Sequence, residues 1–338
     1  MLDRRTTSSP KSLKARVLLA VLALGAGSFL ILFITSPLPK DQKNNTNNQI
    51  AEDLKQRLTE EANKDSDNDG LKDWEEALYA TNLQSPDTDG DGASDGEEIK
   101  VGRDPLKKGP NDTLVIPLKS PDTLSFDSNN STHVFTQSIV SDKTFQNILN
   151  QQGGGKISAD TIEQYLKTIP TKQMLIASDA LDPSLLNVSN DTSANAVKNY
   201  FEFFADIFIK NGEAFTLGDD LTIAYTALST NNAAEFRKLD YMIRAFENII
   251  QEANTLSIPK NILWFHQKEI DLLIKTKKEI VILRNMNEDP IGALAALQSR
   301  VETKNAVTKL WQEDLRQWID KNGISLGAHG DLLFLEKK

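Results

Sequence analysis

Two aligned twelve-residue stretches organise this sequence: DSDNDGLKDWEE from Asp65 to Glu76, and DTDGDGASDGEE from Asp87 to Glu98. Each stretch has Asp at positions 1, 3, 5 and 9, Gly at position 6 and Glu at position 12. Asp at alternate positions directs three carboxylates inward as the chain curls, and Gly at position 6 allows a sharp turn because it tolerates positive φ. The spacing predicts two loops that each surround a hard cation.

This oxygen set suits calcium, which takes six to eight hard oxygen ligands at about 2.3–2.6 Å, far better than it suits zinc or copper. Position 7 contributes a backbone carbonyl, position 9 binds directly or through water, and the Glu at position 12 closes the shell with two oxygens. We expect about two calcium ions. The predicted ligands are Asp65, Asp67, Asp69, Leu71, Asp73 and Glu76 in the first loop, and Asp87, Asp89, Asp91, Ala93, Asp95 and Glu98 in the second.

The acidity of the chain is concentrated in these loops. Residues 65–98 hold eight Asp, four Glu and one Lys, a sum of −11, so the rest of the chain, whose total is −10, sums to +1. Twelve carboxylates in so short a segment would repel one another strongly without a cation. We therefore expect the loops to fold with metal and to loosen without it, the alternative being a solvated acidic segment. The sequence shows no basic patch beyond residue 16, so a nucleic-acid partner is not expected.

The register extends beyond the loops, because the residues that follow each loop also correspond and define tandem repeats at 65–86 and 87–108. An ordinary EF-hand pair needs two helices between its loops, and only the ten residues 77–86 separate these two. There is room for one short helix around residues 74–79.

This arrangement resembles the bacterial thrombospondin type 3 repeat, in which DxDxDGxxDxxE is followed by a short helix, a Gly-Thr-Asp-Pro-like turn and DTDGDG. The corresponding turns here read Ala80-Thr81-Asn82-Leu83 and Gly102-Arg103-Asp104-Pro105, and the first departs from the pattern at three positions. The resemblance covers about 44 of the 338 residues. It implies a calcium-bound extracellular module, often with an adhesive or spacer role.

An uncharged apolar run, VLLAVLALGAGSFLILFIT, extends from Val17 to Thr35. As a helix it would measure about 28 Å, close to the hydrocarbon thickness of a bilayer. Five basic residues and one Asp precede it, so the positive-inside rule predicts a cytoplasmic tail at 1–16, a signal-anchor helix at 17–36 and an extracellular remainder. A cleaved signal peptide, giving a secreted protein, is the alternative. It is disfavoured because the run is long and no A-x-A site follows.

The chain is expected to be mostly α-helical. Residues 37–64 are interpreted as a polar spacer followed by a short amphipathic helix with Ile50, Leu54 and Leu58 on one face. Residues 65–108 form the calcium repeats. Residues 109–140 are predicted to be a linker, with a short extended stretch from Thr113 to Leu118. Residues 141–338 are predicted to form a helical bundle.

Start and stop signals place about five to seven helices in the bundle, and no strand pattern of comparable strength is present. Pro just inside a helix start and Gly just past its end support these assignments. The predicted helices begin at Ser158 and end near Pro170, begin at Ser193 and end at Gly212, begin at Asn232, begin at Ser257 with Pro259, and begin at Asp289 with Pro290 and end at Gly323.

No catalytic pattern is present. The chain has no Cys and only three His, and it contains no HExxH, G-x-S-x-G or Walker loop. His266 and Glu269 lie at i, i+3 on a predicted helix, but a di-iron bundle needs two such units in the opposite order, so we expect them to be satisfied core or surface residues. The aromatic side chains Trp264 and Phe265 on one helix, and Trp311 and Trp318 on another, are expected to be core, with an exposed binding face as the alternative.

These features predict a single-pass membrane protein that is not an enzyme. Its calcium repeats would form a rigid spacer and present a helical domain to another envelope or surface protein, with no small-molecule substrate evident. An envelope hydrolase with an acidic site among the helices, and a calcium sensor, are the alternatives.

Overall fold

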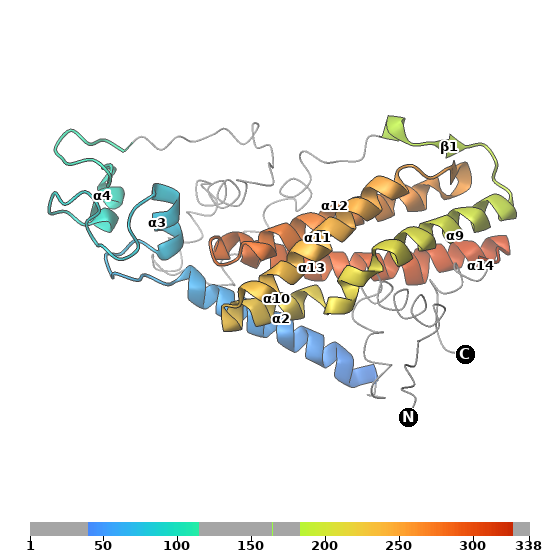
Figure 1. The fold of residues 1–338 in the computed structure, drawn as a ribbon, viewed down its shortest axis with the longest axis horizontal. Helices are drawn as coiled ribbons and strands as arrows, with labels where there is room; N and C mark the ends of the chain where they lie inside the picture. Colours follow the sequence, from blue (N-terminus) through green and yellow to red (C-terminus); the bar gives the residue numbers. More distant parts are fainter. Residues whose placement is uncertain (1–39, 115–163, 165–182, 327–338) are drawn as a thin grey trace, which may run out of the picture. The chain divides into compact units, whose positions relative to one another are not determined.

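The computed structural model describes residues 40–114, 164 and 183–326, and within them the chain is mostly helical, as expected (Figure 1). The chain divides into two compact units. One, called the helical unit below, is formed by residues 1–51, 179–281 and 299–338, and the other by residues 52–178 and 282–298. Within the described ranges, no helix is both long and apolar enough to cross a bilayer. The predicted membrane segment at 17–36, most of the predicted linker and all but residue 164 of the helix predicted from Ser158 lie outside these ranges.

Helix α2 extends from Lys40 to Ala62 and leads into the repeats. It carries the predicted apolar stripe, since Leu54 and Leu58 are fully buried. The helix is longer than the short one expected, because it takes in most of the Asn-rich stretch predicted to be a flexible spacer. That stretch is polar but contains no Pro or Gly after Pro39, so nothing in it stops the helix.

Each repeat contributes one short helix, α3 from Asp73 to Tyr79 and α4 from Asp95 to Val101. The single short helix between the loops agrees with the expected departure from an EF-hand pair. The indole nitrogen of Trp74 on α3 donates to the carbonyl oxygen of Ala62 at 2.9 Å. This bond joins the end of α2 to the first repeat.

In the helical unit, the predicted helix starts are confirmed for α9 and α11. Helix α9 covers Ala194–Asn211 and is capped by Ser193, whose hydroxyl accepts from the Ala196 amide at 3.1 Å. Helix α11 covers Ala233–Ala253 and is capped by the Asn232 side chain. Between them lie the 3₁₀ helix η4 (Gly212–Leu217) and helix α10 (Asp220–Thr230), and α10 was not predicted from the sequence.

A short parallel pairing joins β1 (Val188–Ser189), which follows the 3₁₀ turn η3 (Pro183–Leu185), to β2 (Ile258–Pro259). The prediction that Ser257 and Pro259 open a helix was wrong. The Ile258 amide donates to the carbonyl of Asn187 at 2.8 Å, which holds this segment extended. After the 3₁₀ turn η5 (Lys260–Ile262), helix α12 therefore begins at Leu263 and continues to Arg284.

The last predicted helix starts and stops as expected but is not uniform. Helix α13 covers Pro290–Lys309, a π-helical turn (η6) covers Leu310–Leu315, and α14 covers Arg316–Asn322 before Gly323 ends it with φ 60°. The Asp289 carboxylate accepts from the Gly292 amide at 2.7 Å, which is the expected cap.

An aromatic cluster forms part of the core of the helical unit. Phe204 of α9 and Phe265 of α12 both pack against Trp311 of η6, with ring centroids 6.1 and 5.0 Å from the indole. The nearby polar groups make two paired contacts: the Tyr200 hydroxyl lies 2.9 Å from His266 Nδ1, and Trp311 Nε1 donates to Glu269 at 2.8 Å, while His266 Nε2 is buried without a hydrogen bond to any described residue. Phe265, Trp311, His266 and Glu269 are buried, in agreement with the core assignment, whereas Trp264 and Trp318 are only half-buried.

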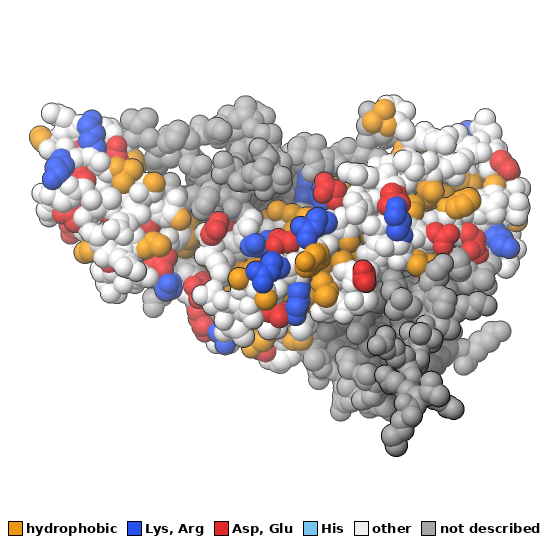
Figure 2. Space-filling model, viewed as in Figure 1, with side chains coloured by type: hydrophobic (Ala, Val, Ile, Leu, Met, Phe, Trp, Pro, Cys, Tyr) orange, Lys and Arg blue, Asp and Glu red, His pale blue; other side chains and the backbone are white. Residues whose placement is uncertain are grey.

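A buried ion network lies in the same unit. Arg300 donates through Nε to Asp220 at 2.5 Å and lies 3.8 Å from Glu279, while Lys304 reaches Asp220 at 2.7 Å. Ser299 and Thr303 each donate to Glu279 at 2.6 Å. On the face drawn in Figure 2, acidic, basic and hydrophobic side chains are interspersed over the helices.

Candidate metal centre

The two loops share one backbone conformation. Position 6 has positive φ in both, 98° at Gly70 and 101° at Gly92. The residue before each helix, Lys72 or Ser94, has φ −82° and ψ 151°. Because the same torsions recur at equivalent positions of the two loops, the predicted repeat is present in the fold as well as in the sequence.

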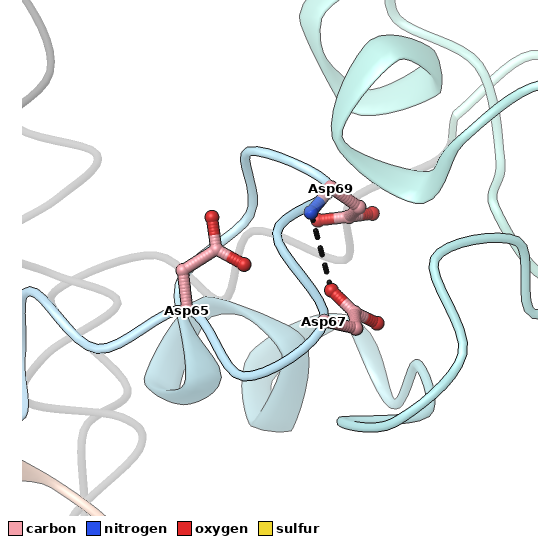
Figure 3. A group of neighbouring side chains, drawn as sticks. All are labelled: Asp65, Asp67 and Asp69. Carbon is pink, nitrogen blue, oxygen red and sulfur yellow. Dashed lines mark hydrogen bonds between the residues drawn. The ribbon is translucent and has the colours of Figure 1, made fainter.

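In the first loop, oxygen atoms of Asp65, Asp67 and Asp69 all lie within 4.8 Å of one another (Figure 3). The loop's own amides hold these carboxylates in place. The Asp69 amide donates to Asp67 at 3.2 Å, and the amide of Leu71 donates to Asp69 at 2.7 Å. The three side chains therefore converge as the alternating pattern predicts.

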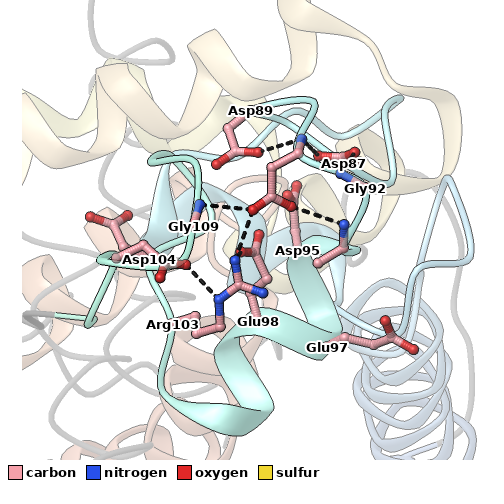
Figure 4. Close-up of polar contacts among 12 residues, drawn as sticks. Asp87, Asp89, Gly92, Asp95, Glu97, Glu98, Arg103, Asp104 and Gly109 are labelled. Carbon is pink, nitrogen blue, oxygen red and sulfur yellow. Dashed lines mark hydrogen bonds and ion pairs between the residues drawn. The ribbon is translucent and has the colours of Figure 1, made fainter.

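The second loop repeats this arrangement, since oxygen atoms of Asp87, Asp89 and Asp91 again lie within 4.8 Å of one another. Asp87 and Asp89 of this loop are drawn in Figure 4. The Asp91 amide donates to Asp89 at 2.9 Å, and the Ala93 amide donates to Asp91 at 2.9 Å. A further candidate cluster joins Asp91 and Glu98 to Asp112, which lies outside the predicted ligand set.

The glutamates at position 12 are among the most buried acidic groups of the repeats, and both Glu76 and Glu98 are fully buried. Burial, together with the neighbouring Asp67 and Asp69 charges, raises the pKa of Glu76 to about 7. Burial likewise raises the pKa of Glu98 to about 7, although the Arg103 charge opposes the shift. Their environment is one in which a carboxylate is costly without a cation nearby.

The residues present fit calcium. Several carboxylate oxygens of the two loops are buried and make no hydrogen bond, and most of them recur at the same repeat positions. A divalent cation ligated by such oxygens would satisfy them and offset the repulsion among the carboxylates. These atoms are Asp65 Oδ1, Asp67 Oδ2 and Glu76 Oε2 in the first loop, and Asp89 Oδ2 and both oxygens of Glu98 in the second, where Glu98 Oε1 also forms an ion pair with Arg103 at 3.1 Å.

The Asp at position 9 braces its loop. Asp73 accepts from the backbone amide and the hydroxyl of Ser66 at 2.7 and 2.9 Å. Asp95 does the same with Thr88 at 2.8 and 2.6 Å. These carboxylates, predicted to bind directly or through water, thus tie position 9 to position 2. At position 7, the backbone amides of Leu71 and Ala93 donate to the Asp at position 5, as described above. The backbone carbonyls of the same two residues are the predicted calcium ligands.

Two residues of the second site were not found by sequence reasoning. Asp112 is 2% exposed and Arg103 donates to it through Nε at 2.5 Å. Asp112 falls in the predicted linker. An antiparallel β-bridge between the backbones of Arg103 and Thr113 brings it to the site. The extended stretch predicted from Thr113 was the one available signal.

The repeats also contact each other. The Gly96 amide of the second repeat donates to Asp69 of the first at 2.9 Å. A Cβ at Gly96 would lie 2.5 Å from the Asp69 carbonyl oxygen, so only glycine allows this approach. The first calcium loop is therefore held in part by the second repeat.

Comparison with known families agrees with this geometry. Residues 65–82 and 87–108 match the bacterial TSP3 repeat, which confirms the resemblance seen in the sequence and supports a calcium-binding role for this segment. No curated protein and no solved structure matches the chain.

Proposed function

We propose that this protein is a membrane-anchored, extracytoplasmic calcium-binding protein whose repeats form a rigid spacer that presents a helical interaction domain. The observation that carries the proposal is the repeated set of buried carboxylate oxygens without hydrogen bonds in the two loops. Calcium supplies the charge that this set lacks.

Rigidity is supported by contacts that run along the repeats. Trp74 ties the first repeat to the end of α2, and Gly96 ties the second repeat to the first. Repeats that contact only their neighbours gain stability from such interfaces. Calcium ligation of both loops would fix the backbone between these contacts.

An extracytoplasmic location is supported by the apolar run at 17–35 and the basic residues before it. Extracellular calcium modules bind at about 10⁻⁴–10⁻³ M, so we expect constitutive occupancy outside the cell. The ion then has a structural role.

The helical domain is proposed to bind another envelope or surface protein. Phe203 of α9 and Tyr241 of α11 support this role, since their side chains are 60% and 53% exposed. Aromatic residues are enriched at protein–protein interfaces relative to the rest of the protein surface. No enzymatic activity is proposed.

Calorimetric titration of the full chain with calcium tests the proposal. We expect two sites, both lost when Asp65→Ala and Asp87→Ala are combined. Glu76→Gln and Glu98→Gln should each weaken one site at least about tenfold, because each removes the charge of a position-12 ligand. Glu97→Gln is the matched control, since Glu97 is exposed and points away from the group in Figure 4.

Circular dichroism in calcium and in chelator separates the alternatives. An unchanged melting transition of the helical unit supports a spacer that carries an independent domain. A helical unit that melts or changes its association when calcium is removed favours the calcium sensor. Absence of calcium binding at millimolar concentration would refute the proposal.

A further inference from the structure

The Asp at position 5 of each loop is held from outside its own loop. In the first loop, Asp69 Oδ2 accepts from the Gly96 amide of the following repeat. The sequence contains no third DxDxDG stretch after the second loop. In the second loop, Asp91 Oδ2 accepts instead from the Gly109 amide and from Arg103 Nη2, both at 2.8 Å. The segment from Arg103 to Leu114, which comprises the end of the second repeat and the residues after it, thus takes the place of a third repeat.

This segment folds back over the second loop. The Leu114 amide donates to the Gly102 carbonyl at 2.9 Å, and the Asp104 amide donates to the Asp112 carbonyl at 2.5 Å. These bonds bring the buried Asp112 beside the loop although it lies beyond the matched repeats. The Lys108 ammonium adds a contact to the Gly90 carbonyl at 3.3 Å.

Arg103 is the cation at the centre of this arrangement (Figure 4). Its guanidinium reaches three carboxylates, at 2.5 Å on Asp112, 2.8 Å on Asp91 and 3.1 Å on Glu98. A planar fork of donors suits several carboxylates at once. Two of these three residues, Asp91 and Glu98, are predicted calcium ligands, so the cation partly neutralises the second site from within the chain.

Among the residues that the structure describes, no equivalent group contacts the first loop. The residue that corresponds to Arg103 in the first repeat is Thr81, whose hydroxyl lies 3.4 Å from Glu76 and brings no charge. Two cations pair with carboxylates of that loop: Lys72, 3.8 Å from Asp65, and Lys64, which is 55% exposed and pairs with Asp73. Exposed or distant pairs of this kind are weak because solvent screens them.

We infer that Arg103, with the segment from Arg103 to Leu114 that it anchors, is a calcium-independent cap that ends the repeat array and keeps the second loop in shape without metal. The first loop, held by Gly96 and without such a cation in the described part of the chain, depends on calcium for its shape. The two sites are therefore unequal: one is preformed and the other orders on binding. This inference deepens the proposed calcium-binding function and rests on it only for the ordering of the first loop.

Hydrogen exchange of equivalent loop amides in the full chain tests the cap. In chelator, and after correction for intrinsic rates, the amides of Gly92 and Ala93 should exchange at least about tenfold more slowly than those of Gly70 and Leu71. Arg103→Thr, which places the first repeat's residue in the second, should remove this difference. Lys107→Thr is the matched control, since it removes one positive charge from the same segment at an exposed position.

Gly109→Ala tests the same contact with Arg103 retained. A Cβ at Gly109 would collide with the Arg103 guanidinium, so this variant should also release the second loop even where Arg103→Thr fails to fold. Equal exchange of the two loops in chelator, or protection of the second loop that survives both variants, would overturn the cap. A protein in which added calcium slows neither loop would refute calcium binding instead, and the comparison in chelator would still decide the cap.

Discussion

The backbone amide of Gly96 donates to Oδ2 of Asp69 at 2.9 Å, so a residue of the second repeat positions a predicted calcium ligand of the first. The bond depends on a close approach that leaves no room for a side chain at Gly96. The two repeats are thus one structural module, and their calcium sites share a support.

Gly96→Ala should separate the repeats. Alanine ordinarily stabilises a helical position by about 1 kcal/mol relative to glycine. Here its Cβ would meet backbone atoms of Asp69 and Leu71 at 2.5 and 3.0 Å, which cannot move away cheaply. We expect a net loss of about 1–3 kcal/mol in the unfolding free energy of the module, measured by urea titration in calcium. Glu97→Ala, an exposed change on the same helix, should leave the midpoint unchanged, and a stabilised Gly96→Ala would contradict the close contact.

The calcium-free repeats should lose stability as pH rises. The folded pKa values of Glu76 and Glu98, about 7, exceed the ordinary value of 4.5, so the folded state binds more protons than the unfolded state between these limits. In chelator the melting temperature of the repeats should fall from pH 5 to pH 8. With calcium the trend should reverse, because binding requires both carboxylates to be ionised. The double variant Glu76→Gln, Glu98→Gln should flatten the chelator profile, and a flat wild-type profile would contradict the prediction.

The helical unit should show its own pH dependence through Glu269. Burial raises its pKa to about 7, so its contribution to stability is largest below pH 4.5 and is lost as pH rises through 7. His266 acts in the opposite direction, because burial lowers its pKa to about 4 and charging it destabilises the fold in acid. Glu269→Gln keeps an acceptor for Trp311 Nε1 and should raise the melting temperature at pH 8 more than at pH 5. Equal effects at both pH values would assign Glu269 a purely steric role.

Arg300→Met should destabilise the helical unit strongly. Arg300 is 1% exposed as a side chain and donates to the buried Asp220, whose pKa is held well below its usual range by the neighbouring Arg300 and Lys304 charges. Removing Arg300 leaves Asp220 with Lys304 and Glu279 with Lys275 as their remaining cations, and loss of one partner from a buried ion network costs about 3–5 kcal/mol. Calorimetric melting should show a large drop in Tm. The control Lys321→Met removes a positive charge at an exposed position, and a similar small shift in both variants would mean that the network contributes little.

Much of the fold could be predicted because its signals are local. Ser193 and Asn232 start their helices through bonds to amides two or three residues ahead, and Gly323 stops one through its own positive φ. Helix α10 was missed even though its cap, Asp219, is equally local. The segment at Ser257 and Pro259 was misassigned because its extended form depends on Asn187, which lies far earlier in the chain.

The candidate site divides in the same way. The sequence alone predicted two acidic loops of the calcium-binding type with their carboxylates at positions 1, 3, 5 and 12, since the residue spacing and the turn at Gly70 or Gly92 are properties of twelve consecutive residues. Only the tertiary structure decided that Asp73 and Asp95 brace their loops, that Gly96 holds Asp69, and that Arg103 and Asp112 close the second site. Those relationships depend on which backbone atoms approach after the chain folds back, and packing, which has no fixed spacing in sequence, decides that approach.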